Sequence, residues 1–154
     1  MRVFIGSDHG GYAMKEELKA YITSLGHTVC DKGTFSGDKA VDYPDIAEAV
    51  CTALLQAKKY CPDEEMYGVL VCGTGIGISI AANKIAGIRC ALCHSHYDAA
   101  MTRCHNDANV IAFGGRTTGI EVAKEMVQAF LSTPFSGAHH TARVAKVAAL
   151  EKKY

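Results

Sequence analysis

The sequence lacks an excess of charge of either sign. Its 154 residues carry 16 Lys and Arg against 16 Asp and Glu, a formal net charge of zero. Proteins that bind nucleic acid or a membrane surface usually show a basic excess, so this balance argues against both kinds of partner. The sequence also has no long apolar run, and Arg2 to Ile5 lead directly into Gly6, Ser7 and Asp8. We therefore expect neither a membrane span nor a secretory leader.

Internal repeats, low-complexity segments and interdomain linkers are also missing. The length then predicts a single domain over residues 1–154. The seven cysteines are an odd number and are spread over predicted strands and helices. Without a secretory leader, they are expected to be reduced thiols in a cytoplasmic protein.

What the sequence does contain is an alternation of short apolar strands and amphipathic helices. The strands are predicted at residues 3–8, 28–31, 69–72, 88–93 and 109–113. Helices are predicted at about 12–25, 43–60, 76–82 and 96–105, then from 118 or 119, and last from an N-cap at Thr141 to the C-terminus. This order predicts an α/β fold: a three-layer α/β/α sandwich with a Rossmann-like parallel sheet of five strands.

The most informative stretch runs from residue 67 to residue 83. A buried strand ends at Cys72, three glycines follow at alternate positions, and a helix begins at Ile76. Backbone N–H groups at such a turn face the crevice beyond the strand and favour negative charge there. Cys72 is therefore expected to lose its proton more readily than a free thiol and to act as a base or nucleophile. The alternative is that Cys72 is a small buried hydrophobe.

Ligands bind beyond the carboxyl ends of the strands in such a sheet, which selects further candidates. Asp8 and His9 follow the first predicted strand, and residues 94–96 and 114–116 follow the fourth and fifth. His105 and Asn106 precede the fifth strand. They join the site only if the short helix returns them to that rim, or if they serve a neighbouring chain.

Arginine is scarce, with five residues in the chain. Arg2 and Arg89 lead into strands and so belong to the opposite rim, while Arg103 lies within a helix. Arg116 and Arg143 remain as the expected anion binders, because a guanidinium group matches phosphate oxygens. Arg143 is predicted in the first turn of the last helix, where free N–H groups would assist it.

A zinc site is a further possibility, because Cys90 and Cys93 form a CxxC pair with histidines nearby. An odd separation within one strand, however, places the two thiols on opposite faces, and no second CxxC follows. Core packing is the expectation for Cys90, as for Cys30 and Cys51.

Together these motifs resemble those of the type B ribose-5-phosphate isomerases and the galactose-6-phosphate isomerase subunits of the same family. The resemblance spans nearly the whole chain. It rests on GSDHGG at 6–11, DYPD at 42–45, CGTGIGISIAANK at 72–84, GIR at 87–89, HNDAN at 105–109 and FGGR at 113–116.

The resemblance implies an aldose–ketose isomerase that interconverts ribose 5-phosphate and ribulose 5-phosphate, in the non-oxidative pentose phosphate pathway, without a metal or organic cofactor. It implies that Cys72 is the base, that the amides of residues 73–77 and the Thr74 hydroxyl hold an enediolate, and that His105 opens the sugar ring. The other residues that it places around the phosphosugar are Asp8, His9, Tyr43, Gly73, Gly75, Ile76, Gly77, Asn106, Arg116 and Arg143. It also implies a homodimer with shared sites, in which His105 and Arg116 reach the other subunit's Cys72.

The sequence departs from the family just before Arg143. Many members carry another arginine there, whereas this chain reads Ala138-His139-His140-Thr141. We expect His139 or His140 to bind phosphate instead, more weakly and with an affinity that declines between about pH 6 and 7.5. The alternative is that both histidines face solvent. An isomerase of a six-carbon phosphosugar, such as allose or galactose 6-phosphate, and a noncatalytic phosphosugar or nucleotide sensor also remain open.

Overall fold

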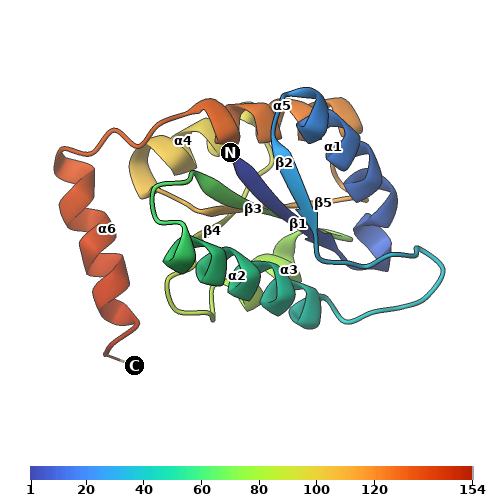
Figure 1. The fold of residues 1–154 in the computed structure, drawn as a ribbon, viewed down its shortest axis with the longest axis horizontal. Coiled ribbons are helices and arrows are strands. Elements are labelled where there is room, and N and C mark those ends of the chain that lie inside the picture. The colour runs from blue at the N-terminus through green and yellow to red at the C-terminus, as the bar shows by residue number, and fades with distance from the viewer. Residues whose placement is uncertain (154) are drawn as a thin grey trace.

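The computed structural model describes residues 1–153, in which five strands form one all-parallel sheet with the order β2-β1-β3-β5-β4 (Figure 1). The strands are β1 (Arg2–Ser7), β2 (Thr28–Asp31), β3 (Met66–Cys72), β4 (Cys90–Leu92) and β5 (Val110–Gly114). The helices are the 3₁₀ helix η1 (His9–Gly11), α1 (Tyr12–Ser24), α2 (Tyr43–Tyr60), α3 (Ile76–Ala82), α4 (His96–Asn106), α5 (Ile120–Ser132) and α6 (His139–Leu150).

Helices cover both faces of the sheet, and each face has its own buried core. The core on one face joins Val3 and Ile5 of β1 to α1, α4 and α5, while the core on the other joins Phe4 to α2 and α3. Figure 1 shows these two layers above and below the sheet. The predicted three-layer fold with five parallel strands is therefore confirmed. Over residues 1–153, no helix is both long and apolar enough to cross a membrane.

The chain changes direction at β1, which creates the crevice expected of such a sheet. From β1 it moves outward to β2, and from there it crosses to β3 on the other side of β1. The turn after β1 is tied to β3, because Asp8 N donates a hydrogen bond to Val71 O at 3.2 Å. The carboxyl ends of β1 and β3 therefore form the switch point at which ligands bind in this architecture.

The last helix, α6, stands apart from the sheet. None of its residues is buried, and it packs against α4 rather than a strand (Figure 1). The predicted N-cap at Thr141 is wrong, since α6 begins two residues earlier at His139. Gly137 and Ala138 both have positive φ and turn the chain immediately before the helix. The backbone turn, rather than a capping side chain, therefore sets where α6 begins.

Candidate active site

Cys72 ends β3 at the switch point, with its sulfur beneath the glycine turn. Sγ accepts a hydrogen bond from Gly75 N at 3.1 Å, and Cys72 is 4% exposed. Gly75 has φ +80°, and a Cβ there would lie 2.7 Å from Leu92 Cδ1 and from the Phe113 backbone. Only glycine therefore permits this close turn. Because α3 has seven residues, the local N–H group, rather than a long helix dipole, provides the positive charge beside the sulfur.

Thr74 and Tyr43 border the same turn. Thr74 is exposed, and its Oγ1 accepts a weak hydrogen bond from Ile76 N at 3.4 Å, which leaves the hydroxyl hydrogen able to donate outward. A Cβ on Gly77 would lie 2.7 Å from Cζ of Tyr43, so the tyrosine ring covers the start of α3. Tyr43 is 40% exposed and forms a wall between the turn and solvent.

A carboxylate and a guanidinium group flank the turn from the β1 and β5 sides. Asp8 is buried, and its Oδ1 accepts a hydrogen bond from Gly11 N at 3.1 Å, while His9 is exposed. A Cβ on Gly10 would lie 3.3 Å from both Asp8 Oδ1 and Arg116 Nη2, so both side chains lie close to the Gly10 backbone. The structure thus places Asp8, Tyr43 and residues 73–77 at the rim that holds Cys72, with His9 next to Asp8 at the start of η1.

Arg116 belongs to the Cys72 turn of its own chain. Its backbone N donates to Gly73 O at 3.0 Å, and a Cβ on Gly73 would lie 3.4 Å from its Nη1. The expectation that Arg116 reaches the other subunit's Cys72 is therefore wrong. β5 lies beside β3 in the sheet, so the residues that follow the two strands meet within one chain.

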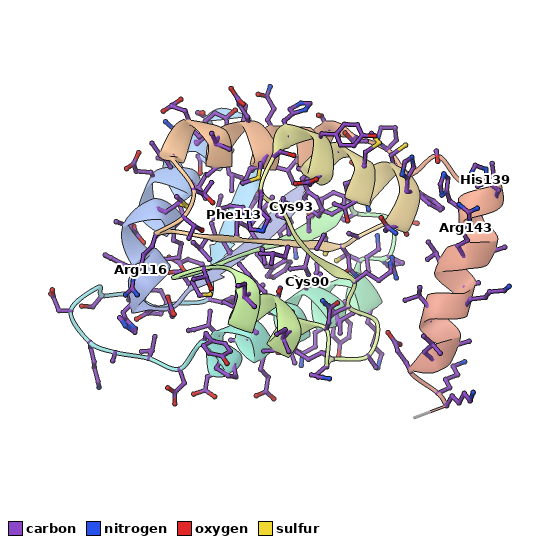
Figure 2. All side chains as sticks on the ribbon, turned by 180° about the vertical axis from the view of Figure 1, so that it is seen from behind. Cys90, Cys93, Phe113, Arg116, His139 and Arg143 are labelled. Carbon is purple, nitrogen blue, oxygen red and sulfur yellow. The ribbon has the colours of Figure 1, made fainter. Side chains whose placement is uncertain are left out.

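The remaining predicted residues form a second group at the opposite rim. The His105 and His140 rings stack with centroids 4.4 Å apart, and the His139 and His140 centroids are 4.0 Å apart. His105, Asn106, His140 and Arg143 line a hollow of about 1130 Å³ between α6 and the body of the protein. In Figure 2, Arg116 lies at one end of the molecule, whereas His139 and Arg143 lie at the other.

α4 therefore does not return His105 and Asn106 to the rim that holds Cys72. β5 alone, from Val110 to Gly114, separates the two rims by about 13 Å. Arg143 also differs from its prediction. Because α6 begins at His139, Arg143 lies in the second turn, beyond the free N–H groups of the helix start.

The sequence predicts His139 or His140 as a phosphate binder, and in the structure His140 is the central member of this second group. Its ring contacts those of both His105 and His139. Partial burial lowers the pKa of His140 below its ordinary value of 6.5, and the neighbouring His139, His105 and Arg143 lower it further. The feature of the sequence that indicates a role for His140 is its position next to His139 and one helical turn before Arg143.

Three other thiols, those of Cys51, Cys90 and Cys93, pack in the two cores. Burial raises the pKa of Cys51 to about 12 and that of Cys93, which Asp98 also raises, to about 12. Burial likewise raises the pKa of Cys90. Cys90 packs against the α2–α3 core and Cys93 lies in the opposite core, so the two face away from each other as predicted. Within residues 1–153 no three His, Cys, Asp or Glu side chains gather as a metal site, and every cysteine is unpaired.

Comparison with known proteins identifies the family. The family model described as Ribose/Galactose Isomerase matches residues 3–147. The chain belongs to the ribose/galactose isomerase family. It is 43% identical over 152 residues to ribose-5-phosphate isomerase B of Escherichia coli K12, covering 99% of this chain and 97% of that protein.

Solved structures in this family share the fold. Ribose-5-phosphate isomerase B of Clostridium thermocellum has a TM-score of 0.92 and 44% identity, over 100% of this chain and 99% of that chain. The Mycoplasma genitalium enzyme, solved with bound ribulose-5-phosphate, has a TM-score of 0.89 and 34% identity, over 99% and 97% of the two chains. The likeness therefore extends over nearly the whole length of the chain.

Proposed function

We propose that this chain interconverts ribose 5-phosphate and ribulose 5-phosphate, with Cys72 as the base. Family membership and the bound ribulose-5-phosphate of the Mycoplasma genitalium relative support the substrate. The observation that carries the mechanism is the sulfur at the switch point, 3.1 Å from a donating N–H group. This N–H group points at the sulfur and can donate to a thiolate there.

In the aldose-to-ketose direction, Cys72 removes the proton on C2 and returns it to C1. The electron pair of the C2–H bond forms the double bond of an enediolate, and the C1 carbonyl oxygen takes the negative charge. The Thr74 hydroxyl and the N–H groups of the turn donate to that oxygen. A proton moves from O2 to O1, and C1 then takes the proton from sulfur. Nothing is oxidised or reduced overall.

Ribose 5-phosphate exists mainly as a closed furanose, so its ring must open before C2 can react. His105 is the proposed group that donates a proton to the ring oxygen. Proton transfer needs a heavy-atom distance of about 3 Å, and the two rims of one chain are too far apart for that. A second chain must therefore bring His105 to the Cys72 turn.

A symmetric homodimer would complete two sites at once. Ile76 and Ile80 lie one turn apart on α3 beside Cys72, and they are 52% and 56% exposed. The hollow beside His105 has an apolar wall from α6, made by Val144, Val147 and Leu150. If α3 of each subunit lies in the hollow of the other subunit, both apolar surfaces are buried. Two-fold symmetry then brings the Cys72 turn of each subunit to the His105 of the other, so that two complete sites form.

In this dimer the phosphate would lie between guanidinium groups from both chains. Arg116 lies at the Cys72 turn, while Arg143, His139 and His140 come from α6 of the other subunit. Asn106, next to His105, would hold sugar hydroxyls. The seven unpaired cysteines support a reducing compartment, and we propose the cytoplasm.

The decisive assay compares turnover of ribose 5-phosphate with that of allose 6-phosphate and galactose 6-phosphate, each with and without EDTA. We expect the five-carbon substrate to have the largest kcat/KM and the chelator to have no effect. Preferred turnover of a six-carbon phosphosugar would contradict the substrate. Binding of ribose 5-phosphate without turnover would contradict the catalytic proposal.

A further inference from the structure

Arg89 is a residue that the sequence set aside because it leads into a strand at the rim opposite Cys72. In the structure it holds the end of α4. Its Nε donates to Asp107 O at 2.8 Å, and its Nη2 donates to Asp107 O at 2.7 Å and to Asp107 Oδ2 at 2.9 Å. One guanidinium group thus binds both the main chain and the carboxylate of Asp107.

The backbone of Arg89 is fixed as well. Arg89 N donates to Asn109 Oδ1 at 2.9 Å, and Arg89 O accepts from Asn109 N at 3.1 Å. The Asn109 side chain also donates to Gly87 O at 2.8 Å. The guanidinium group therefore projects from a rigid base, and its position sets the position of Asp107.

Asp107 needs this support because of its conformation. It ends α4 with φ 47° and ψ 42°, a left-handed conformation that residues other than glycine seldom adopt. Such residues persist where surrounding contacts hold them. Besides Arg89, the Asp107 carboxylate accepts a hydrogen bond from Arg103 Nη1 at 2.8 Å.

Asp107 directly follows Asn106 and lies two residues after His105, so the turn that Arg89 holds carries two proposed site residues. Arg89, His105 and Asn106 all line the same hollow. We propose that Arg89 is a positioning residue for His105: its clamp on Asp107 fixes the last turn of α4, and with it the imidazole that opens the sugar ring. This inference rests on the proposed function.

The proposal separates two steps of the reaction. Ribose 5-phosphate closes to a furanose, whereas ribulose 5-phosphate, with its carbonyl on C2 and its O5 phosphorylated, is acyclic. Exchange of the C1 proton of ribulose 5-phosphate with solvent therefore requires the Cys72 base but no ring opening. A displaced His105 slows isomerisation of ribose 5-phosphate and spares that exchange.

The test is Arg89→Met, which keeps an unbranched side chain and removes all three side-chain hydrogen bonds from residue 89 to Asp107. Its matched control is Arg2→Met. Arg2 also enters a strand at this rim, and its ion pair with Glu64 has side chains 32% and 34% exposed, against 26% and 35% for Arg89 and Asp107. Both variants lose one partly exposed ion pair, but only Arg89 contacts the turn that follows His105.

We expect Arg89→Met to lower kcat for ribose 5-phosphate by about ten- to a hundredfold, a usual effect of a misplaced acid–base group. Exchange from ribulose 5-phosphate in Arg89→Met should change by less than about threefold, because it does not require His105. Both rates in Arg2→Met should also change by less than about threefold, because Arg2 pairs with Glu64 and does not hold the turn that follows His105. Arg89→Lys retains a single ammonium donor in place of the planar fork, so it should fall between wild type and Arg89→Met. Arg89→Lys carries the test by itself if Arg89→Met does not fold.

Equal loss of both activities in the Arg89 variants, or no loss beyond that of Arg2→Met, would overturn the proposal. NMR resonances of the His105 ring add a readout that is independent of turnover. They should shift in Arg89→Met and stay in place in Arg2→Met, because the stack on His140 depends on where α4 ends. An inactive wild type with this NMR difference would refute the proposed function but not the clamp, and unchanged resonances would refute the clamp itself.

Discussion

Mixing two inactive variants tests whether each site draws Cys72 from one chain and His105 from another. Cys72→Ala removes the base, and His105→Asn removes the ring-opening acid. β5 separates the two rims of a single chain by about 13 Å, several times the reach of a proton transfer. Each variant alone should therefore have little activity, since both of its sites lack an essential group.

A mixed dimer of the two variants contains one site with both groups intact and one site with neither. Random mixing of equal amounts makes half of the dimers mixed, so recovery should reach about a quarter of wild-type activity. The subunits are exchanged by dilution and reassociation, mixed dimers are counted by native mass spectrometry, and turnover of ribose 5-phosphate is measured. Cys72→Ala mixed with the double variant Cys72→Ala/His105→Asn serves as the control, because it cannot form an intact site.

Mixed dimers without recovered activity would refute the reasoning, since they would show that one chain supplies both groups. A wild-type protein that remains monomeric yet active would refute it equally.

Three further predictions follow from single contacts. His139→Arg should lower KM for ribose 5-phosphate and make KM rise less steeply with pH, because an arginine keeps its charge. In wild type the rise of KM should extend below pH 6.5, because the pKa of His140 is lowered and this histidine loses its charge as pH increases. Measuring KM of both proteins from about pH 5 to 8 checks the two expectations. Asp31→Asn should lower the free energy of unfolding by about 2 kcal/mol in urea titrations, because it removes the carboxylate 2.6 Å from the fully buried Lys15 ammonium, which then keeps only its 3.0 Å ion pair with the partly exposed Glu16. Burial alone would raise the pKa of Asp31, but hydrogen bonds from lysines lower it, so in wild type this contribution is present above about pH 4 and is lost in stronger acid, as acid titration of unfolding can show. Gly75→Ala should reduce kcat about tenfold or more with a smaller change in KM, because the strained turn withdraws the N–H group from the Cys72 sulfur.

The periodicity of the sequence predicts most of the fold because each element has a clear pattern. α2 runs from Tyr43 to Tyr60 and α3 from Ile76 to Ala82, as predicted. The start of β3 at Met66 was missed, because Tyr67 and Gly68 interrupt the apolar run. The start of α6 was missed because backbone turns at Gly137 and Ala138, rather than a capping side chain, set it.

The candidate site likewise contains residues whose place the sequence predicts and residues whose place it does not. Cys72 and its glycines could be found from the sequence because they are contiguous. The location of His105 could not, since it depends on strand order and on which rim α4 ends at. Arg116 shows the same limit, because the neighbouring positions of β3 and β5 place it in the turn of its own chain. The Arg89–Asp107 contact has no local signature at all, since it joins residues 18 positions apart.

The most direct measurement of the central claim is exchange of the C1 proton of ribulose 5-phosphate with deuterium from solvent in Cys72→Ala. Cys51→Ala is the matched control, because burial raises the pKa of that thiol to about 12 and keeps it protonated. We expect Cys72→Ala to bind the phosphosugar in calorimetry but to exchange no proton, while Cys51→Ala exchanges at close to the wild-type rate. Exchange at the wild-type rate in Cys72→Ala would show that Cys72 is not the base.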